Sequence, residues 1–203
     1  MSGLTVGVLA LQGDFREHIA MVHRISIEDD PVHAVAVRTA ADLDRIDALI
    51  IPGGESTTIG RLARIYGLIE PLRELIHRGV PALGTCAGMI FLASGTTGPP
   101  QPQLEVLDVV VERNAFGRQV DSFEADLPIA GSSEPVLAVF IRAPWIYKMG
   151  ADVEVLATVL DPDEGEERAV FVRQANVLAT SFHPELTGDT RIHEMLVSMA
   201  KEF

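Results

Sequence analysis

A cysteine between two glycines is the residue of this sequence best suited to act as a nucleophile. Cys86 lies in the segment Gly84-Thr85-Cys86-Ala87-Gly88, which follows a short apolar run and opens a helical pattern. A nucleophile on such a sharp strand-to-helix turn projects from the carboxyl end of a sheet, and the helix N-terminus favours the reactive thiolate. The alternative is a buried structural cysteine, which is the commoner situation for a free thiol. The strand–turn–helix context favours the nucleophile.

A general base and a group to orient it are available near the end of the chain. His183 follows the apolar run 177–182, and Pro184 and Glu185 come directly after it. Because alternate residues of an extended segment point the same way, we expect His183 and Glu185 to form a base–carboxylate pair at the sheet edge that carries Cys86. Surface or satisfied core positions are expected for His23, His33, His77 and His193.

A second glycine-containing turn can bind the negative charge that an acyl transfer develops. Pro52-Gly53-Gly54-Glu55-Ser56 follows the apolar run 48–51 and opens another helical pattern. The N–H groups of paired glycines can face an oxyanion, as can the N–H of the residue after the thiol. The alternative is an ordinary strand–helix turn. Because a candidate nucleophile, Cys86, lies on the neighbouring strand-to-helix turn (the nucleophile elbow), we expect the N–H groups of Gly54 and Ala87 to form an oxyanion hole.

The composition narrows the class of protein. Of 203 residues, 47% are hydrophobic and 22% charged, as in ordinary globular domains, and the net charge is −13. Such a surface repels phosphate backbones and anionic bilayers, so we expect neither nucleic acid nor a membrane as a partner. The lone cysteine excludes an internal disulfide and a zinc site of several thiolates, so we expect no metal and no cofactor. A persistent thiol and a start without a signal-peptide pattern predict a cytoplasmic protein.

Strands and helices alternate in the first half of the sequence. Apolar runs predict strands at 4–11, 32–37, 48–51 and 80–83. Apolar spacing predicts helices at 14–25, 56–65, from 71 to the stop at 79, and from the Cys86 turn to 93, with a short helix near 43–46. Asp14 is the expected N-cap of the first of these helices, and Ser56 and Thr57 can cap the second. This alternation is typical of a parallel sheet covered on both faces.

The second half contains strand-like runs with little helix between them. They follow a Pro/Gly-rich loop at 95–103 and cover 106–112, 119–123, 136–141, 153–159, 169–172 and 177–182. The acidic segment 161–167 predicts a hairpin turn, and 189–203 predicts a terminal helix. We therefore expect an α/β domain with a central, mostly parallel sheet and extra antiparallel strands in its second half.

The motifs PGGES, GTCAG and SFHPE, in this order, resemble those of the class I, triad-type glutamine amidotransferases. The segments GVLALQGDFREH and VERNAFGRQVDSFEADL resemble one subfamily, the glutaminase subunits of pyridoxal 5'-phosphate synthase, and the similarity covers nearly the whole chain. The resemblance implies a single domain over residues 1–203, a flavodoxin-like three-layer fold, and hydrolysis of L-glutamine to L-glutamate and ammonia. It implies that Cys86 is the nucleophile, His183 the base and Glu185 its orienter.

The resemblance also implies which residues bind glutamine. They are Gly54, Glu55, Ser56, Arg113, Ile141 and Arg142. An arginine suits this role because its guanidinium can bind the α-carboxylate of a free amino acid through two hydrogen bonds. The commoner role of an arginine is a solvated surface charge.

The same resemblance implies a partner, a (β/α)8-barrel synthase subunit that consumes the ammonia, in assemblies with twelve copies of each subunit. We expect the polar segment 12–18 to form the docking face, with Arg16, Glu17 and His18 as candidate contacts; a solvated first helical turn is the alternative. The segments Ser26–Pro31 and Asp161–Glu167 depart from the usual pattern of the subfamily.

Other functions fit the sequence less well. A class I glutaminase that serves histidine or cobalamin biosynthesis would share the triad motifs but would not usually carry VERNAFGRQ. A stress-type protease or chaperone with an elbow cysteine would not have the downstream pair of His183 and Glu185. A non-catalytic regulatory module would have no need of all three triad residues.

Overall fold

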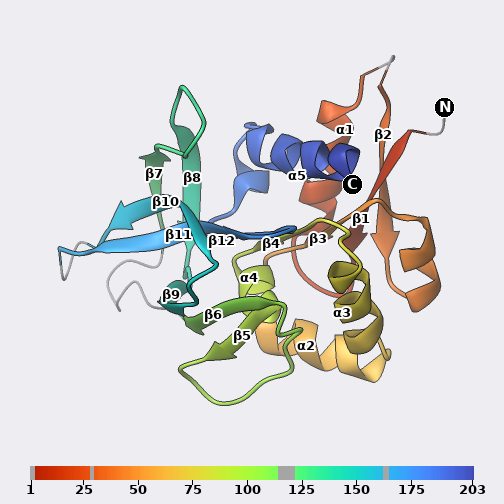
Figure 1. Cartoon of the computed structure of the whole chain (residues 1–203), viewed down its shortest axis with the longest axis horizontal. Coiled ribbons are helices and arrows are strands. Elements are labelled where there is room, and N and C mark those ends of the chain that lie inside the picture. Colours follow the sequence, from red (N-terminus) through yellow and green to blue (C-terminus); the bar gives the residue numbers. More distant parts are fainter. Residues whose placement is uncertain (1–2, 28–29, 114–121, 162–164) are drawn as a thin grey trace.

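A computed structural model describes residues 3–27, 30–113, 122–161 and 165–203 of the chain (Figure 1). Its centre is a seven-stranded sheet in the order β10-β11-β12-β4-β3-β1-β2. The strands are β1 (Leu4–Leu9), β2 (Val32–Val37), β3 (Ala48–Ile51), β4 (Ala82–Thr85), β10 (Glu154–Leu160), β11 (Glu167–Gln174) and β12 (Val177–Thr180). The pairs from β12 through β2 are parallel, whereas β11 is antiparallel to both of its neighbours. The expected mostly parallel sheet with added antiparallel strands is confirmed.

Helices cover both faces of this sheet, which gives the expected three layers (Figure 1). On one face lie α1 (Phe15–Ile25) and α5 (Arg191–Glu202). On the other lie α2 (Ser56–Ile65), α3 (Ile69–His77) and the short α4 (Ala87–Leu92), while a 3-10 helix, η1 (Ala40–Arg45), links β2 to β3. Among the described residues, no helix combines the length and the apolar character needed to cross a membrane.

The central strands supply side chains to two separate cores because successive residues of a strand face opposite sides. In β3, Leu49 and Ile51 pack with α2, α3 and α4, whereas Ala48 and Ile50 pack with α1 and α5. All four are fully buried. A strand that is apolar on both faces therefore lies at the centre of the sheet, and its carboxyl end is packed on both sides.

Two smaller sheets extend the second half of the chain. One contains β5 (Ala93–Thr96), β6 (Leu107–Glu112) and β9 (Trp145–Met149), and the other is the hairpin of β7 (Ser122–Leu127) and β8 (Val136–Ile141). The sequence predicted neither β5 nor β9. The helix expected to reach Ala93 ends at Leu92, because Ala93 is extended and pairs with Leu107.

Some predicted segments end differently or lie partly outside the described residues. The first strand stops at Leu9 rather than at 11, and β12 stops at Thr180 rather than at 182. β10 and β11 pair as a hairpin around the predicted turn at 161–167, of which 162–164 are outside the described residues. So are residues 28–29 of the segment 26–31, and residues 114–121 within VERNAFGRQVDSFEADL.

Candidate active site

The sharp turn at Cys86 is built by close packing at the carboxyl end of β4. Cys86 itself has φ 48° and ψ −105°, a backbone conformation that residues other than glycine rarely adopt. Its N–H donates to the carbonyl oxygen of Thr180 at 2.8 Å, which ties the turn to β12. A Cβ on Gly88 would lie 2.0 Å from the carbonyl oxygen of Ile51, and one on Gly84 would lie 2.8 Å from the backbone of Gly88. Both flanking positions therefore have to be glycine, as the elbow pattern predicts.

His183 and Glu185 form a buried pair beside the thiol. His183 Nδ1 and Glu185 Oε1 are 2.7 Å apart, and the N–H of His183 donates to the carbonyl oxygen of Val139 at 2.9 Å. The predicted pairing is present, but the predicted geometry was wrong. Glu185 lies in the 3-10 turn η2 (Pro184–Leu186) rather than in an extended segment, so the turn and not strand alternation brings it to His183.

The charges of these groups are tightly linked. Burial lowers the pKa of His183, but hydrogen bonds to Cys86 and Glu185 outweigh burial and raise the pKa to about 10. Burial raises the pKa of Glu185, and the hydrogen bond with His183 opposes that rise. A protonated imidazole between a sulfur and a carboxylate is the arrangement that stabilises a thiolate. The three side chains therefore have the arrangement of a nucleophile, a base and an orienting group.

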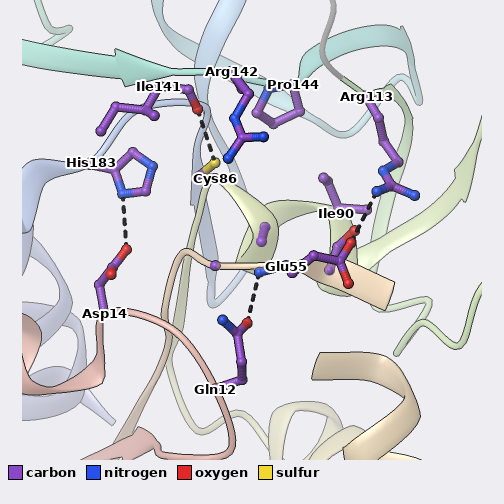
Figure 2. Close-up of a pocket in the computed structure, with 13 residues that line it drawn as sticks. Gln12, Asp14, Glu55, Cys86, Ile90, Arg113, Ile141, Arg142, Pro144 and His183 are labelled. Carbon is purple, nitrogen blue, oxygen red and sulfur yellow. Dashed lines mark hydrogen bonds and ion pairs between the residues drawn. The ribbon is translucent and has the colours of Figure 1, made fainter. Parts of the chain in front are cut away.

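The thiol opens into a pocket of about 470 Å³ (Figure 2). The pocket is lined by Gln12, Asp14, Gly54, Glu55, Ser56, Cys86, Ala87, Ile90, Arg113, Ile141, Arg142, Pro144 and His183. This volume is within the range of small-molecule sites. Every residue that the sequence predicted for the site lines this pocket except Glu185, which is buried behind His183.

The loops that follow β1 and β3 are joined to each other at the edge of the pocket. Gln12 Oε1 accepts the backbone N–H of Glu55 at 2.7 Å (Figure 2). The backbone N–H of Asp14 donates to the carbonyl oxygen of Gly53 at 3.3 Å. Gly54 has φ +144°, and a Cβ there would lie 2.5 Å from Gln12 Oε1. The candidate oxyanion loop is thus fixed by contacts that require glycine.

An ion pair crosses the mouth of the pocket. Arg113 lies 3.1 Å from Glu55 Oε1, and the Glu55 side chain also accepts hydrogen bonds from Thr57 and Thr58 at the start of α2. Glu55, rather than the predicted Ser56 or Thr57, is therefore the N-cap. Partial burial raises the pKa of Glu55, but the hydrogen bonds from Thr57 and Thr58 lower it to about 2. The hydroxyl of Ser56 instead donates to Gln101 Oε1 at 3.2 Å.

Ile141 and Arg142 form the opposite wall. The carbonyl oxygen of Ile141 lies 4.0 Å from Cys86 Sγ, and Arg142 has a positive φ of 43°. Figure 2 shows the Arg142 side chain beside Cys86, across the pocket from Glu55. The wall therefore places a cation and a carbonyl oxygen close to the thiol.

Asp14 is an addition that sequence reasoning missed. It occupies the predicted N-cap position of α1, but its side chain makes no capping hydrogen bond, and its Oδ2 lies 3.7 Å from His183 Nδ1. The ligand atoms of Asp14, His183 and Glu185 lie within 4.8 Å of one another, close enough to hold a metal. A metal at Nδ1 would have to displace the short contact with Glu185.

His18 corrects the predicted docking face. It is fully buried, and its Nε2 lies 3.3 Å from Glu185 Oε2, so it cannot contact a partner, whereas Arg16 and Glu17 are exposed. The sequence did carry a signal for this burial, because His18 is at helical spacing from the buried Met21 and Val22.

Comparison with known proteins places this geometry in a family. A model described as "SNO glutamine amidotransferase family" matches residues 8–202. A relative from Frankia casuarinae (strain DSM 45818 / CECT 9043 / HFP020203 / CcI3), named "Pyridoxal 5'-phosphate synthase subunit PdxT", is 53% identical over 99% of this chain and 97% of its own length. A protein of the same name from Acidothermus cellulolyticus (strain ATCC 43068 / DSM 8971 / 11B) is 56% identical over 96% of this chain and 92% of its own length.

Solved structures agree with the sequence relatives. One described as "Crystal structure of glutamine amidotransferase" superimposes with a TM-score of 0.87 at 51% identity, and covers 97% of this chain and 98% of that one. The structure of PurLQS from Thermotoga maritima has a TM-score of 0.68 at 17% identity over 100% of this chain and 99% of that one, which supports the fold alone. With more than half of its residues identical to those relatives along nearly its whole length, the chain belongs to the SNO glutamine amidotransferase family.

Proposed function

We propose that this chain is the glutaminase subunit of a pyridoxal 5'-phosphate synthase, and that it hydrolyses L-glutamine to L-glutamate and ammonia. The observation that carries the proposal is the series of side-chain contacts from Cys86 to His183 to Glu185, which begins at the pocket and ends in the core. The relatives at 53% and 56% identity carry the synthase name, which supports the assignment to this subfamily.

In the proposed reaction, the thiolate of Cys86 attacks the side-chain amide carbon of glutamine. Backbone N–H groups of Gly54 and Ala87 bind the oxyanion of the tetrahedral intermediate. His183 then donates its proton to the departing nitrogen, and ammonia leaves a γ-glutamyl thioester on Cys86. A water molecule, deprotonated by His183, attacks the thioester, so that glutamate is released and the Cys86 thiolate and the protonated His183 are restored. Glu185 keeps the imidazole oriented and stabilises its protonated form.

Three charged side chains at the pocket suit the α-ammonium and α-carboxylate groups of a free amino acid. The carboxylate of Glu55 stays ionised at neutral pH, since its pKa is about 2, and it can bind the α-ammonium. Arg142 and Arg113 are the candidates for the α-carboxylate, and the carbonyl oxygen of Ile141 and the hydroxyl of Ser56 border the same space.

The proposal includes a (β/α)8-barrel synthase subunit as the partner, twelve copies of each subunit in the assembly, and a cytoplasmic location. Ammonia released into water is protonated to a non-nucleophilic ion, so a protected path to a docked partner is an advantage. We retain Arg16 and Glu17 as candidate docking contacts, because they are exposed on the helix that follows the loop bonded to Gly53. Docking can adjust that loop and raise activity. We treat residues 1–203 as a single amidotransferase domain.

The test is glutamate production by this chain with and without the barrel subunit, for the wild type and for Cys86→Ala. We expect the partner to stimulate the wild type, and Cys86→Ala to lose several orders of magnitude in kcat with an unchanged circular dichroism spectrum. An active Cys86→Ala variant would exclude the mechanism. Equal wild-type activity with and without partner would exclude the coupling, and undiminished stimulation of Arg16→Ala/Glu17→Ala would exclude only the docking face.

A further inference from the structure

Two buried histidines lie behind the triad carboxylate, and the proposed reaction uses neither of them. His18 projects from α1 and His193 from α5, and both are fully buried. A buried imidazole needs hydrogen-bond partners, because an unsatisfied polar group in the core is costly. Their partners identify what the pair does.

The contacts form a chain that ends at Glu185. His193 Nε2 lies 2.9 Å from His18 Nδ1. On the other side of the ring, His18 Nε2 lies 3.1 Å from Thr85 Oγ1 and 3.3 Å from Glu185 Oε2. Thr85 directly precedes Cys86, so the His18 ring touches both the nucleophile turn and the carboxylate.

The second carboxylate oxygen of Glu185 needs this contact. Oε1 is taken by His183, whereas Oε2 is buried and has no hydrogen-bond partner among the described residues. His18 Nε2 is the nitrogen that faces it, at 3.3 Å. A bare nitrogen lone pair beside a carboxylate oxygen would be repulsive, so we assign the ring proton of His18 to Nε2. Thr85 and Glu185 then share this one N–H.

His193 fixes that tautomer. With the proton on Nε2, His18 Nδ1 is an acceptor, and it accepts the N–H of His193 Nε2. The unused Nδ1 of His193, which has no partner among the described residues, is then a lone pair rather than a buried N–H. The opposite tautomer would turn a lone pair toward Glu185.

Both histidines are neutral at physiological pH, and this matters for the charge of the triad. Burial lowers the pKa of His18 well below its ordinary range, with further electrostatic lowering from the neighbouring rings of His193 and His183, and burial lowers the pKa of His193 to about 4. A neutral donor can hold Glu185 Oε2 without cancelling the negative charge that His183 needs. A second imidazolium would compete with His183 for the same carboxylate.

We propose that His18 is a positioning residue of this glutaminase, that its Nε2–H holds Oε2 of Glu185, and that His193 holds His18 in the required tautomer. The proposal rests on the proposed function, because Glu185 is taken as the orienter of His183. It extends the line of contacts from the thiol through the core to α5.

The test compares His18→Leu, which removes the donor, with His18→Gln, whose side-chain amide can donate from nearly the same place. His23→Leu is the control, because His23 is exposed on the same helix. Two quantities are measured: kcat and KM for glutamine in the complex with the synthase partner, and the pH midpoint for alkylation of Cys86 by iodoacetamide. Alkylation needs neither glutamine nor turnover, so it reports on the triad even if the proposed function is wrong.

We expect His18→Leu to lower kcat by about tenfold to a hundredfold, the effect of losing one hydrogen bond to a charged group, with little change in KM. The alkylation midpoint should move to higher pH, because a less ordered Glu185 supports the imidazolium less. His18→Gln should recover most of both losses, and His23→Leu should match the wild type. His193→Leu should shift both quantities in the same direction by a smaller factor.

A His18→Leu variant with wild-type kcat and midpoint would overturn the proposal. So would a His18→Gln variant as impaired as His18→Leu, since that would indicate packing rather than hydrogen bonding. If His18→Leu does not fold, His193→Leu decides, because it leaves His18 in place: an unchanged alkylation midpoint there would refute the chain of contacts. Absence of glutaminase activity in the wild-type complex would refute the proposed function, and the alkylation profiles would still test His18.

Discussion

The substitution Gly53→Ala should disable the site through one methyl group. Gly53 precedes the candidate oxyanion residue, and a Cβ there would lie 2.4 Å from Cε1 and 2.9 Å from Nδ1 of His183. Gly53 does not have a positive φ, so alanine can adopt its backbone conformation. The expected effect is therefore on the position of the base and not on folding.

The size of the effect follows from these distances. Ordinary carbon–carbon contacts begin at about 3.5 Å, so either the His183 ring or the Gly53 loop must move by roughly 1 Å. The ring is held by its 2.7 Å contact with Glu185, and the loop is held by the hydrogen bond from Asp14 to the Gly53 carbonyl. If the ring yields, the base is misplaced; if the loop yields, the N–H of Gly54 is misplaced. A displacement of this size costs about a hundredfold in rate.

The assay is kcat for glutamine hydrolysis in the complex with the synthase partner, together with the thermal midpoint of unfolding. Gly98→Ala is the matched control, because a Cβ at Gly98 meets nothing within 4 Å and its φ is not positive. We expect Gly53→Ala to fall about a hundredfold in kcat with a near-normal unfolding midpoint, and Gly98→Ala to behave as wild type. A Gly53→Ala enzyme within twofold of wild type would show that His183 tolerates the methyl group and that its packing against this loop is not required.

Three further predictions concern single groups of the site. Glu185→Gln should lower kcat less than His183→Asn, because Glu185 orients the imidazole whereas His183 transfers the proton. The reverse order of kcat values in steady-state assays would show that His183 is not the base. Arg113→Ala or Arg142→Ala should raise KM for glutamine, and unchanged KM in both would remove the arginines from the site. Glu55→Gln should destabilise the protein by about 1 kcal/mol at pH 7 by weakening the cap of α2. Because the folded pKa of Glu55 is about 2, below its ordinary value of 4.5, that difference should be complete above pH 4.5 and shrink as the pH falls toward 2; a pH-independent difference between the two unfolding midpoints would contradict it.

Strands formed by continuous, mostly apolar runs were the part of the fold that the sequence predicted best. The bounds of Val32–Val37, Ala48–Ile51 and Val136–Ile141 match the structure, because each is an apolar run that ends at a turn residue or a change of polarity. Trp145–Met149 was missed. Tyr147 and Met149 are exposed there, and the strand exists because it pairs with β6, a contact distant in sequence. Pairing partners of this kind leave no periodic signal in the strand itself.

The site residues, like the strands, were predicted where the signal was local and missed where it depended on tertiary contacts. The three motif residues were found from local patterns, since each follows a strand end or a glycine turn. Asp14 was predicted to cap a helix. It does occupy the N-cap position of α1, but its side chain lies near His183 instead of capping the helix. His193 was expected to be a surface or satisfied core residue, and the contact with His18 depends on how α5 packs across α1. That packing is a tertiary property, so no single-sequence pattern contains it.

The backbone at Cys86 has a consequence for the history of such domains. Its φ of 48° and ψ of −105° are a conformation that glycine adopts freely and that costs other residues on the order of 1–3 kcal/mol. Reactivity and stability thus oppose each other at this one position, and only selection for the reaction keeps a side chain there. In a descendant that had lost its substrate, mutation at residue 86 would be favoured rather than merely tolerated, and glycine would be the residue to which it drifts. An intact elbow cysteine in a relative is therefore stronger evidence of present-day catalysis than an intact fold, which survives its loss.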